Sequence, residues 1–223
     1  MELFILPENV NGLDDDAKEK LRKLLEVYSY TQPNNNIKER YYEGKITLNE
    51  VNLGIALPKG IAGLQIGCSW GAKTVDVLAG RSMFDGFVGE NGEEVDELAK
   101  IVKDNNLIAE YPKACRDELK IGCSFITLSA DDDIKCRIRF HSTRSASAIW
   151  DGEKGRIAYG MAILDTAPSN DNINNWTPSV IRLDTEDAMW ILTRFEATWT
   201  AEKHPHKLGR PLIEPLVEGR AHV

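Results

Sequence analysis

The feature that most constrains the fold is a change in the spacing of apolar residues near residue 122. Before this point, apolar residues recur at intervals of three and four, which is the period of a helix buried on one face. After it, residues 135–140 alternate between basic and apolar side chains, which is the period of a strand. The sequence therefore predicts an α+β fold, in which N-terminal helices precede a mainly antiparallel β-sheet region.

The helical part is predicted to cover residues 1–121. A helix over residues 14–28 starts at an acidic run and carries one apolar stripe. Pro33 suits the first turn of a second helix that Gly44 ends. Further helices are predicted over residues 69–82, 93–103 and 108–121, with an irregular connection at 47–67 and a short strand at 84–88.

The β-rich part is predicted to cover residues 122–200, followed by an extended tail over residues 201–223. Strands are predicted over residues 124–128, 135–140, 147–150, 156–164, 179–183 and 189–198. The acidic run Asp131, Asp132 and Asp133 forms the turn of a hairpin, and residues 168–175 form another turn. The whole chain, residues 1–223, is interpreted as a single domain.

Charge and cysteine content exclude several classes of function. The net charge of −8 and a pI near 5.1 disfavour sequence-independent binding to nucleic acid, which depends on clustered Lys and Arg. Cys68, Cys115, Cys123 and Cys136 form no C-x-x-C pair and have no His at ligand spacing, so we expect reduced thiols and no zinc site. No run approaches the ~20 apolar residues of a membrane span, and the first residues do not resemble a signal peptide.

Three groups of residues are candidates for a phosphate-binding or metal-binding site. The glycine-rich residues 67–71 precede Lys73 and Thr74 but lack the P-loop spacing, so a tight turn and helix cap is the favoured reading. His204 and His206 flank a proline and have no third metal ligand nearby. The acidic run at 131–133 resembles a divalent-ion site, although acids also gather in hairpin turns for backbone reasons.

A basic stripe is the remaining candidate surface. Lys135, Arg137 and Arg139 share one face of a predicted strand, with Arg144 nearby. Such a stripe fits an acidic partner protein or a nucleic-acid backbone, but it more often protects a solvated sheet face against aggregation. The chain has no G-x-S-x-G or H-E-x-x-H pattern. We therefore assign no catalytic, cofactor-binding or metal-binding residue and expect no enzyme.

Four blocks, taken in order, resemble the portal proteins of tailed double-stranded DNA bacteriophages, in the subgroup typical of siphophages of Gram-positive hosts. The blocks are RYYEGK at residues 40–45, KTVDVLAGRSMFDGF at 73–87, LAKIVKDNNLIAEYPKACRDELKIGCSFITL at 98–128 and HKLGRPLIEPL at 206–216. The third block is the strongest match. Each block is short and mostly structural, so the resemblance depends on their combination and order.

The resemblance implies a structural subunit of a ring at one capsid vertex. In that family the ring is the channel for DNA packaging and ejection and the docking platform for terminase and head-tail connector proteins. The implied partners are other portal subunits, capsid and scaffold proteins, terminase and head-completion proteins, with double-stranded DNA passing through the ring without specific binding by this chain. The implied location is the cytoplasm of a bacterial host during assembly, and the virion afterwards.

The resemblance covers only the part of the family called the wing. The last residues, EGRAHV at 218–223, do not resemble the family's run into a long channel-lining helix. We therefore expect a wing-like domain without the channel part. Two alternatives come from other classes: a metal-dependent nucleic-acid-processing enzyme that uses Asp131, Asp132 and Asp133, and a host-derived interaction module.

Overall fold

The computed structural model describes residues 10–47, 54–56, 58–62, 64–66, 70–89, 95–130, 134–169, 172–196 and 198–217. Its helices are α1 (Asp15–Tyr42), α2 (Lys59–Ala62), α3 (Trp70–Arg81), α4 (Asp96–Asp104) and α5 (Leu107–Ile121). Its strands are β1 (Val10–Asn11), β2 (Ile46–Thr47), β3 (Gln65–Ile66), β4 (Ser124–Ser129), β5 (Arg137–Ser142), β6 (Ala146–Asp151), β7 (Arg156–Ser169), β8 (Asn172–Asp184), β9 (Ala188–Phe195), β10 (Thr198–Pro205) and β11 (Ile213–Leu216). The predicted α+β class, with helices first and a mainly antiparallel sheet region after them, is confirmed.

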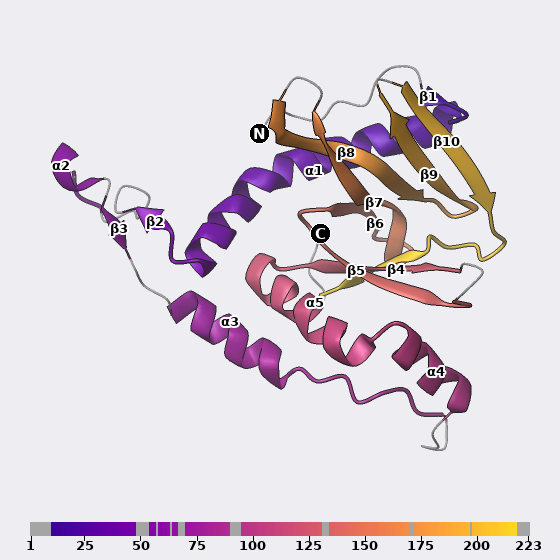
Figure 1. Cartoon of the computed structure of the whole chain (residues 1–223), viewed down its shortest axis with the longest axis horizontal. Coiled ribbons are helices and arrows are strands. Elements are labelled where there is room, and N and C mark those ends of the chain that lie inside the picture. Colours follow the sequence, from indigo (N-terminus) through magenta and orange to yellow (C-terminus); the bar gives the residue numbers. More distant parts are fainter. Residues whose placement is uncertain are drawn as a thin grey trace.

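The strands form a large sheet, a small sheet and a short two-stranded ladder (Figure 1). The large sheet has the order β1-β10-β9-β8-β7-β6, and the small sheet has the order β11-β4-β5. Every pair is antiparallel except β1 with β10. The hairpin predicted around the acidic turn is confirmed by the pairing of β4 with β5, while the turn itself, residues 131–133, lies outside the described residues.

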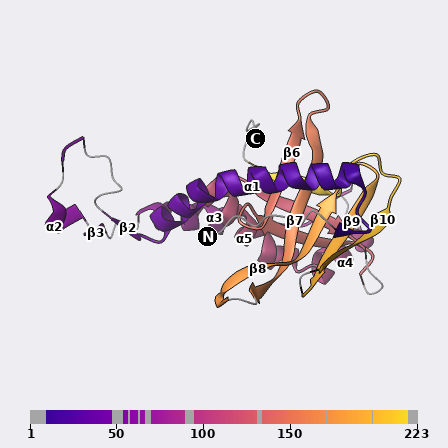
Figure 2. The ribbon, with the colours of Figure 1, turned by 90° about the horizontal axis from the view of Figure 1, so that it is seen from above.

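Helix α1 lies across one face of the large sheet (Figure 2). Asp14 caps it, because its Oδ1 accepts a hydrogen bond from the backbone N of Ala17 at 2.8 Å. The predicted stripe is confirmed, and its buried members pack against the sheet. The buried residues of this first core are Ala17, Leu21, Leu24, Leu25, Met161, Ile181, Leu183, Ala188, Trp190, Leu192 and Trp199.

The prediction of two helices in this region is wrong, since α1 continues through Pro33 to Tyr42. Proline removes one helical hydrogen bond and usually breaks or kinks a helix. Here the turn around it is held from outside, by side chains that contact the loop between β5 and β6. Gln32 Nε2 donates to the Thr143 carbonyl at 2.9 Å, and Asn35 Nδ2 donates to Thr143 Oγ1 at 3.3 Å. Both side chains are buried.

The small sheet covers the opposite face of the large sheet at β6 and β7, and α5 covers the outer side of the small sheet. Their second core contains Cys123, Phe125, Ala146, Ala148, Ile157, Ala162 and Ile213. The layers approach closely at Gly160. A Cβ atom there would lie 2.8 Å from Ile213 Cγ2 and 3.2 Å from Ala148 Cβ. A side chain at position 160 therefore has no room.

Several strand boundaries differ from the prediction. The single strand predicted over residues 189–198 is two strands, β9 and β10, because the chain reverses at Glu196, whose φ is +53°. Neither glycine nor proline marks this turn, so the sequence pattern did not reveal it. The short strand predicted over residues 84–88 does not form, since this segment contains only an isolated bridge at Val88 and Gly86 has a φ of +125°. Strands β7 and β8 run further than predicted, and Pro168 pairs with Trp176 inside them.

The residues predicted as an extended tail include paired strands. Residues 201–205 complete β10, which pairs with β9, and β11 pairs with β4. The C-terminal part of the described chain thus contributes to both sheets. Ile213, on β11, is fully buried in the second core. The pairing was not predicted because prolines at 205, 211 and 215 indicated irregular structure.

The close approach at Gly160 predicts the cost of adding one methyl group. We expect Gly160→Ala to reduce the free energy of unfolding by about 1–3 kcal/mol, because Ile213 and Ala148 are buried and cannot move away freely. Urea denaturation monitored by circular dichroism measures this change. Gly152→Ala is the control, since nothing lies within 4 Å of its Cβ position. Equal stability of the two variants would contradict the prediction.

Candidate functional site at the junction of α1, α3 and α5

The C-terminal half of α1 reaches beyond the sheets and meets α3 and α5 (Figure 1). At this junction Asp76 of α3 accepts two hydrogen bonds on the same oxygen, Oδ1. Tyr42 Oη donates from the end of α1 at 2.8 Å, and Arg116 Nε donates from α5 at 2.8 Å. Burial is the main cause that raises the pKa of Tyr42, and the hydrogen bond to Asp76 adds to it. One carboxylate therefore links three helices.

Lys120 of α5 forms the inner part of the junction. Its Nζ lies 3.0 Å from Glu39 Oε2 of α1 and 3.1 Å from Asp117 Oδ1 of its own helix, and it stands over the Tyr42 ring at 5.2 Å from the centroid. Desolvation acts to lower the pKa of Lys120, but the hydrogen bonds to Glu39 and Asp117 outweigh it, so the pKa is raised. The lysine is a fixed cation here.

A further contact joins α1 to the end of α5. Lys38 Nζ donates to the carbonyl of Ile121, the last residue of α5. A cation at a helix C-terminus is favourable because the free carbonyls carry partial negative charge. Gly122 follows with φ +108°, as expected for the glycine predicted to end this helix. Helices α1 and α5 are therefore held both at their sides and at this end.

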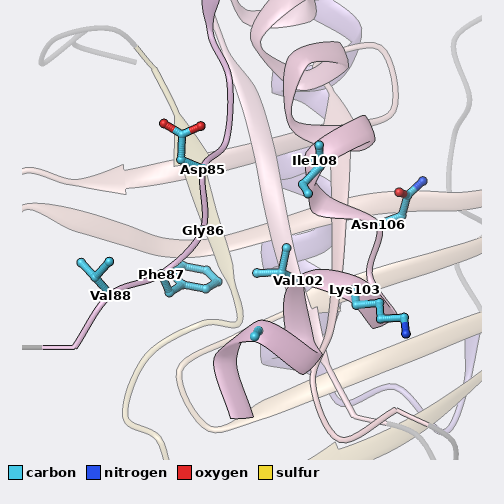
Figure 3. Close-up of a pocket in the computed structure, with 9 residues that line it drawn as sticks. Asp85, Gly86, Phe87, Val88, Val102, Lys103, Asn106 and Ile108 are labelled. Carbon is cyan, nitrogen blue, oxygen red and sulfur yellow. The ribbon is translucent and has the colours of Figure 1, made fainter. Parts of the chain in front are cut away.

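A pocket of about 580 Å³ lies at the other end of the helical layer, between the chain after α3 and the α4–α5 turn (Figure 3). The Phe87 ring points toward Val102, while the side chains of Asp85 and Lys103 lie at the edge. Phe84 contacts both Phe87 and Tyr111 of α5, with ring centroids 5.2 and 5.7 Å apart. The lining is mostly apolar and offers no paired acid and base.

Within the part of the chain that the structure describes, the remaining sequence candidates do not converge on a reaction centre. Asp131, Asp132 and Asp133 lie outside the described residues, as do residues 67–69 of the glycine-rich fragment. Lys73 is exposed on α3, and Thr74 Oγ1 donates to the Trp70 carbonyl within that helix at 2.9 Å. Among the described residues, no group of three or more His, Cys, Asp or Glu side chains is placed to hold a metal ion.

The two histidines have different surroundings. His204 is exposed at the end of β10, with Nε2 3.6 Å from Glu202 Oε1, whereas both ring nitrogens of His206 are buried. On β5, Arg139 is exposed and Arg137 is half-buried, while Phe140, on the opposite side, packs against Tyr111 with ring centroids 6.4 Å apart. The predicted alternation of this strand is confirmed at these positions.

Three of the four cysteines lie within the described residues, and all three are free thiols. Cys115 and Cys123 are buried, and Cys136 is half-buried. Burial raises the pKa of Cys123 to about 12, so this residue stays a neutral thiol near pH 7 and is a poor nucleophile. Cys68 lies outside the described residues.

Comparison with models of known protein families gives no match. Comparison with curated proteins gives no match either. In the described part of the chain, no helix combines the length and apolar character needed to cross a membrane. The assignment of function therefore depends on the sequence blocks and on the junction.

The junction brings together three of the four blocks that resemble portal proteins. Tyr42 belongs to the block at 40–45, Asp76 to the block at 73–87, and Arg116 and Lys120 to the block at 98–128. The contacts between these blocks are not evident from the sequence. Their residues are 34 and 40 positions apart in the chain, so no local period could reveal the pairing.

We expect a measurable coupling between Asp76 and Arg116. In a double-mutant cycle with Asp76→Asn and Arg116→Gln, the coupling free energy should be about 0.5–1 kcal/mol, because the pair is partly exposed and screened by water. Chemical denaturation of the four proteins measures it. Glu110→Gln with Lys113→Gln is the matched control within α5, and it should give about 0.3 kcal/mol. No coupling between Asp76 and Arg116 would contradict the assigned junction.

Proposed function

We propose that this chain is a wing-like part of a phage portal subunit, with a structural and assembly role and no catalytic activity. The observation that carries the proposal is the junction, in which residues from three resembling blocks contact one another. The proposed partners are other portal subunits, capsid and scaffold proteins, terminase and head-completion proteins.

The outer surface of α1 supports a role in binding other proteins. Tyr30, Ile37 and Tyr41 are 83%, 48% and 49% exposed, and their spacing of seven and four residues places them on one stripe of the helix. Tyr42 and Glu39, which contact α3 and α5, lie on the other side of the helix. Trp70, Val77 and Leu78 of α3 are also exposed. Exposed apolar groups gathered in this way mark contact surfaces more often than isolated ones do.

The geometry of the junction suits a rigid support. Its charged groups are engaged with one another, and Lys120 is held between two carboxylates. A general acid or base needs a free position facing a substrate, together with a pKa near the working pH. The junction instead fixes the directions of α1, α3 and α5. In a ring subunit, such a support would keep the contact surfaces of neighbouring copies in register.

The assembly role predicts that the α1 stripe is needed for incorporation into particles. We expect Ile37→Glu to reduce incorporation at least about ten-fold, because a charge in a protein contact costs more than 1.4 kcal/mol. The tagged chain would be co-expressed with the capsid and scaffold proteins of a siphophage of a Gram-positive host, and particles would be isolated by sedimentation and immunoblotted. Phe195→Glu, at an exposed aromatic residue on β9, is the control. Equal incorporation of the two variants would contradict a role for the stripe, and absence of the unmodified chain from particles would contradict the proposed function.

The non-enzymatic role makes a second prediction. The purified chain should leave linear and circular double-stranded DNA intact in the presence of Mg²⁺ or Mn²⁺, as judged by gel electrophoresis over several hours. The triple variant Asp131→Ala, Asp132→Ala, Asp133→Ala should behave identically. Hydrolysis that requires a divalent ion and disappears in the triple variant would instead establish the metal-dependent enzyme.

A further inference from the structure

The large and small sheets are joined on the β8 side by a buried arginine. Arg182 of β8 is 3% exposed; its Nε donates to Asp184 Oδ2 at 2.7 Å, and its Nη2 donates to Asp184 Oδ1 at 2.8 Å. The same Nη2 donates to the Leu128 carbonyl of β4 at 2.6 Å and to the Leu212 carbonyl, just before β11, at 3.4 Å. One guanidinium therefore contacts both sheets.

This bridge borders the second core, since Arg182 stands opposite Ala162 in the β7–β8 ladder. Arg182 and Asp184 point away from α1, because their strand neighbours Ile181 and Leu183 belong to the first core. The second core holds the small sheet against β6 and β7 instead. On the β8 side, the contact between the sheets is made by the Arg182 guanidinium, which is also paired with Asp184 of its own strand. The strength of a buried charged group depends on the charges around it.

His141 of β5 faces this bridge from the small sheet. Its Nε2 lies 2.9 Å from the Oγ1 of Thr127, a fully buried residue of β4. Burial, together with the smaller effects of the cations Arg182 and Arg139, lowers the pKa of His141 to about 4. The imidazole is therefore neutral near pH 7 while the two sheets are in contact.

His206 is the second histidine near the bridge. Neither of its ring nitrogens has a hydrogen-bond partner among the described residues, and its positive form would favour the ionised form of Asp184. Burial nevertheless raises the pKa of Asp184, against the opposing effects of Arg182 and His206. The charged groups that act on His141 are thus Arg182 and Arg139, and Arg182 is in turn paired with Asp184, on which His206 also acts.

We propose that this bridge is an acid-sensitive joint. Protonation of His141 places a second cation beside Arg182, and the small sheet separates from β8 while α1 stays packed on the opposite face of the large sheet. Separation removes the contacts of Arg182 with the carbonyls of Leu128 and Leu212. The backbone amides of β4 and of the segment leading to β11 then lose protection against hydrogen exchange.

The direction of the pH effect follows from the two pKa changes. A lowered pKa means that the closed joint favours neutral His141. The stabilisation of the closed joint by His141 is therefore complete above pH 6.5 and is lost as the pH falls toward 4. Asp184 acts in the opposite sense, because a raised pKa means that the closed joint favours the protonated acid at low pH. A test must therefore isolate the contribution of His141.

The contribution of His141 is isolated by hydrogen exchange of the whole chain at pH 8 and pH 5, corrected for intrinsic exchange rates. His141→Gln keeps a hydrogen-bonding group beside Thr127 but cannot be protonated. For peptides from β4 and β11, acidification should reduce protection about 30-fold more in the unmodified chain than in this variant, as expected for a pKa that moves from about 4 to 6.5 on opening. His204→Gln, at an exposed histidine, should respond like the unmodified chain.

A second variant covers the case in which His141→Gln does not fold. Arg139 is exposed, so Arg139→Gln should fold, and removing this cation should reduce the acid response of β4 and β11 in the same direction by a smaller factor. The joint is disproved if neither variant changes the acid response. It is also disproved if acid reduces protection equally in β4, β9 and α1, because that result is global unfolding rather than separation of the sheets.

Discussion

The packing of α1 is the interaction on which the rest of the structure depends. Leu21 and Leu24, in its first half, are fully buried against the large sheet, and its last turns hold α3 and α5 through Glu39 and Tyr42. At 1.5 Å per residue, a helix of 28 residues is about 42 Å long. One rigid element thus belongs both to the main core and to the helical layer outside it.

This packing agrees with the proposed structural role, in which the chain holds contact surfaces in place. At the junction, Asp76 and Lys120 are engaged by residues of neighbouring helices, so the relative directions of α1, α3 and α5 are fixed. The outward face of α1 presents Tyr30, Ile37 and Tyr41 to solvent. A fixed support behind an exposed apolar surface suits a subunit that assembles with others, which is the role proposed from the resembling blocks.

The small sheet is attached to the large one by two kinds of contact with different responses to solution conditions. At Gly160 the attachment is steric and apolar, since Ile213 fills the space that a side chain would occupy. At Arg182 it is electrostatic and includes the carbonyls of Leu128 and Leu212. Apolar contact is nearly independent of pH, whereas a buried charged pair near two histidines is not. We therefore expect acid to weaken the contact at Arg182 more than the contact at Gly160.

The sequence by itself determined the features that depend on local periodicity and on capping. The α1 stripe, the cap at Asp14, the end of α5 at Gly122 and the hairpin of β4 with β5 follow from the side chains of neighbouring residues. Only the tertiary structure decided that α1 continues through Pro33, because the side chains that hold this turn bind Thr143, more than a hundred residues away. It also decided the contacts of Asp76 and Arg182, since hydrogen bonds between distant segments exist only after the apolar cores have brought those segments together.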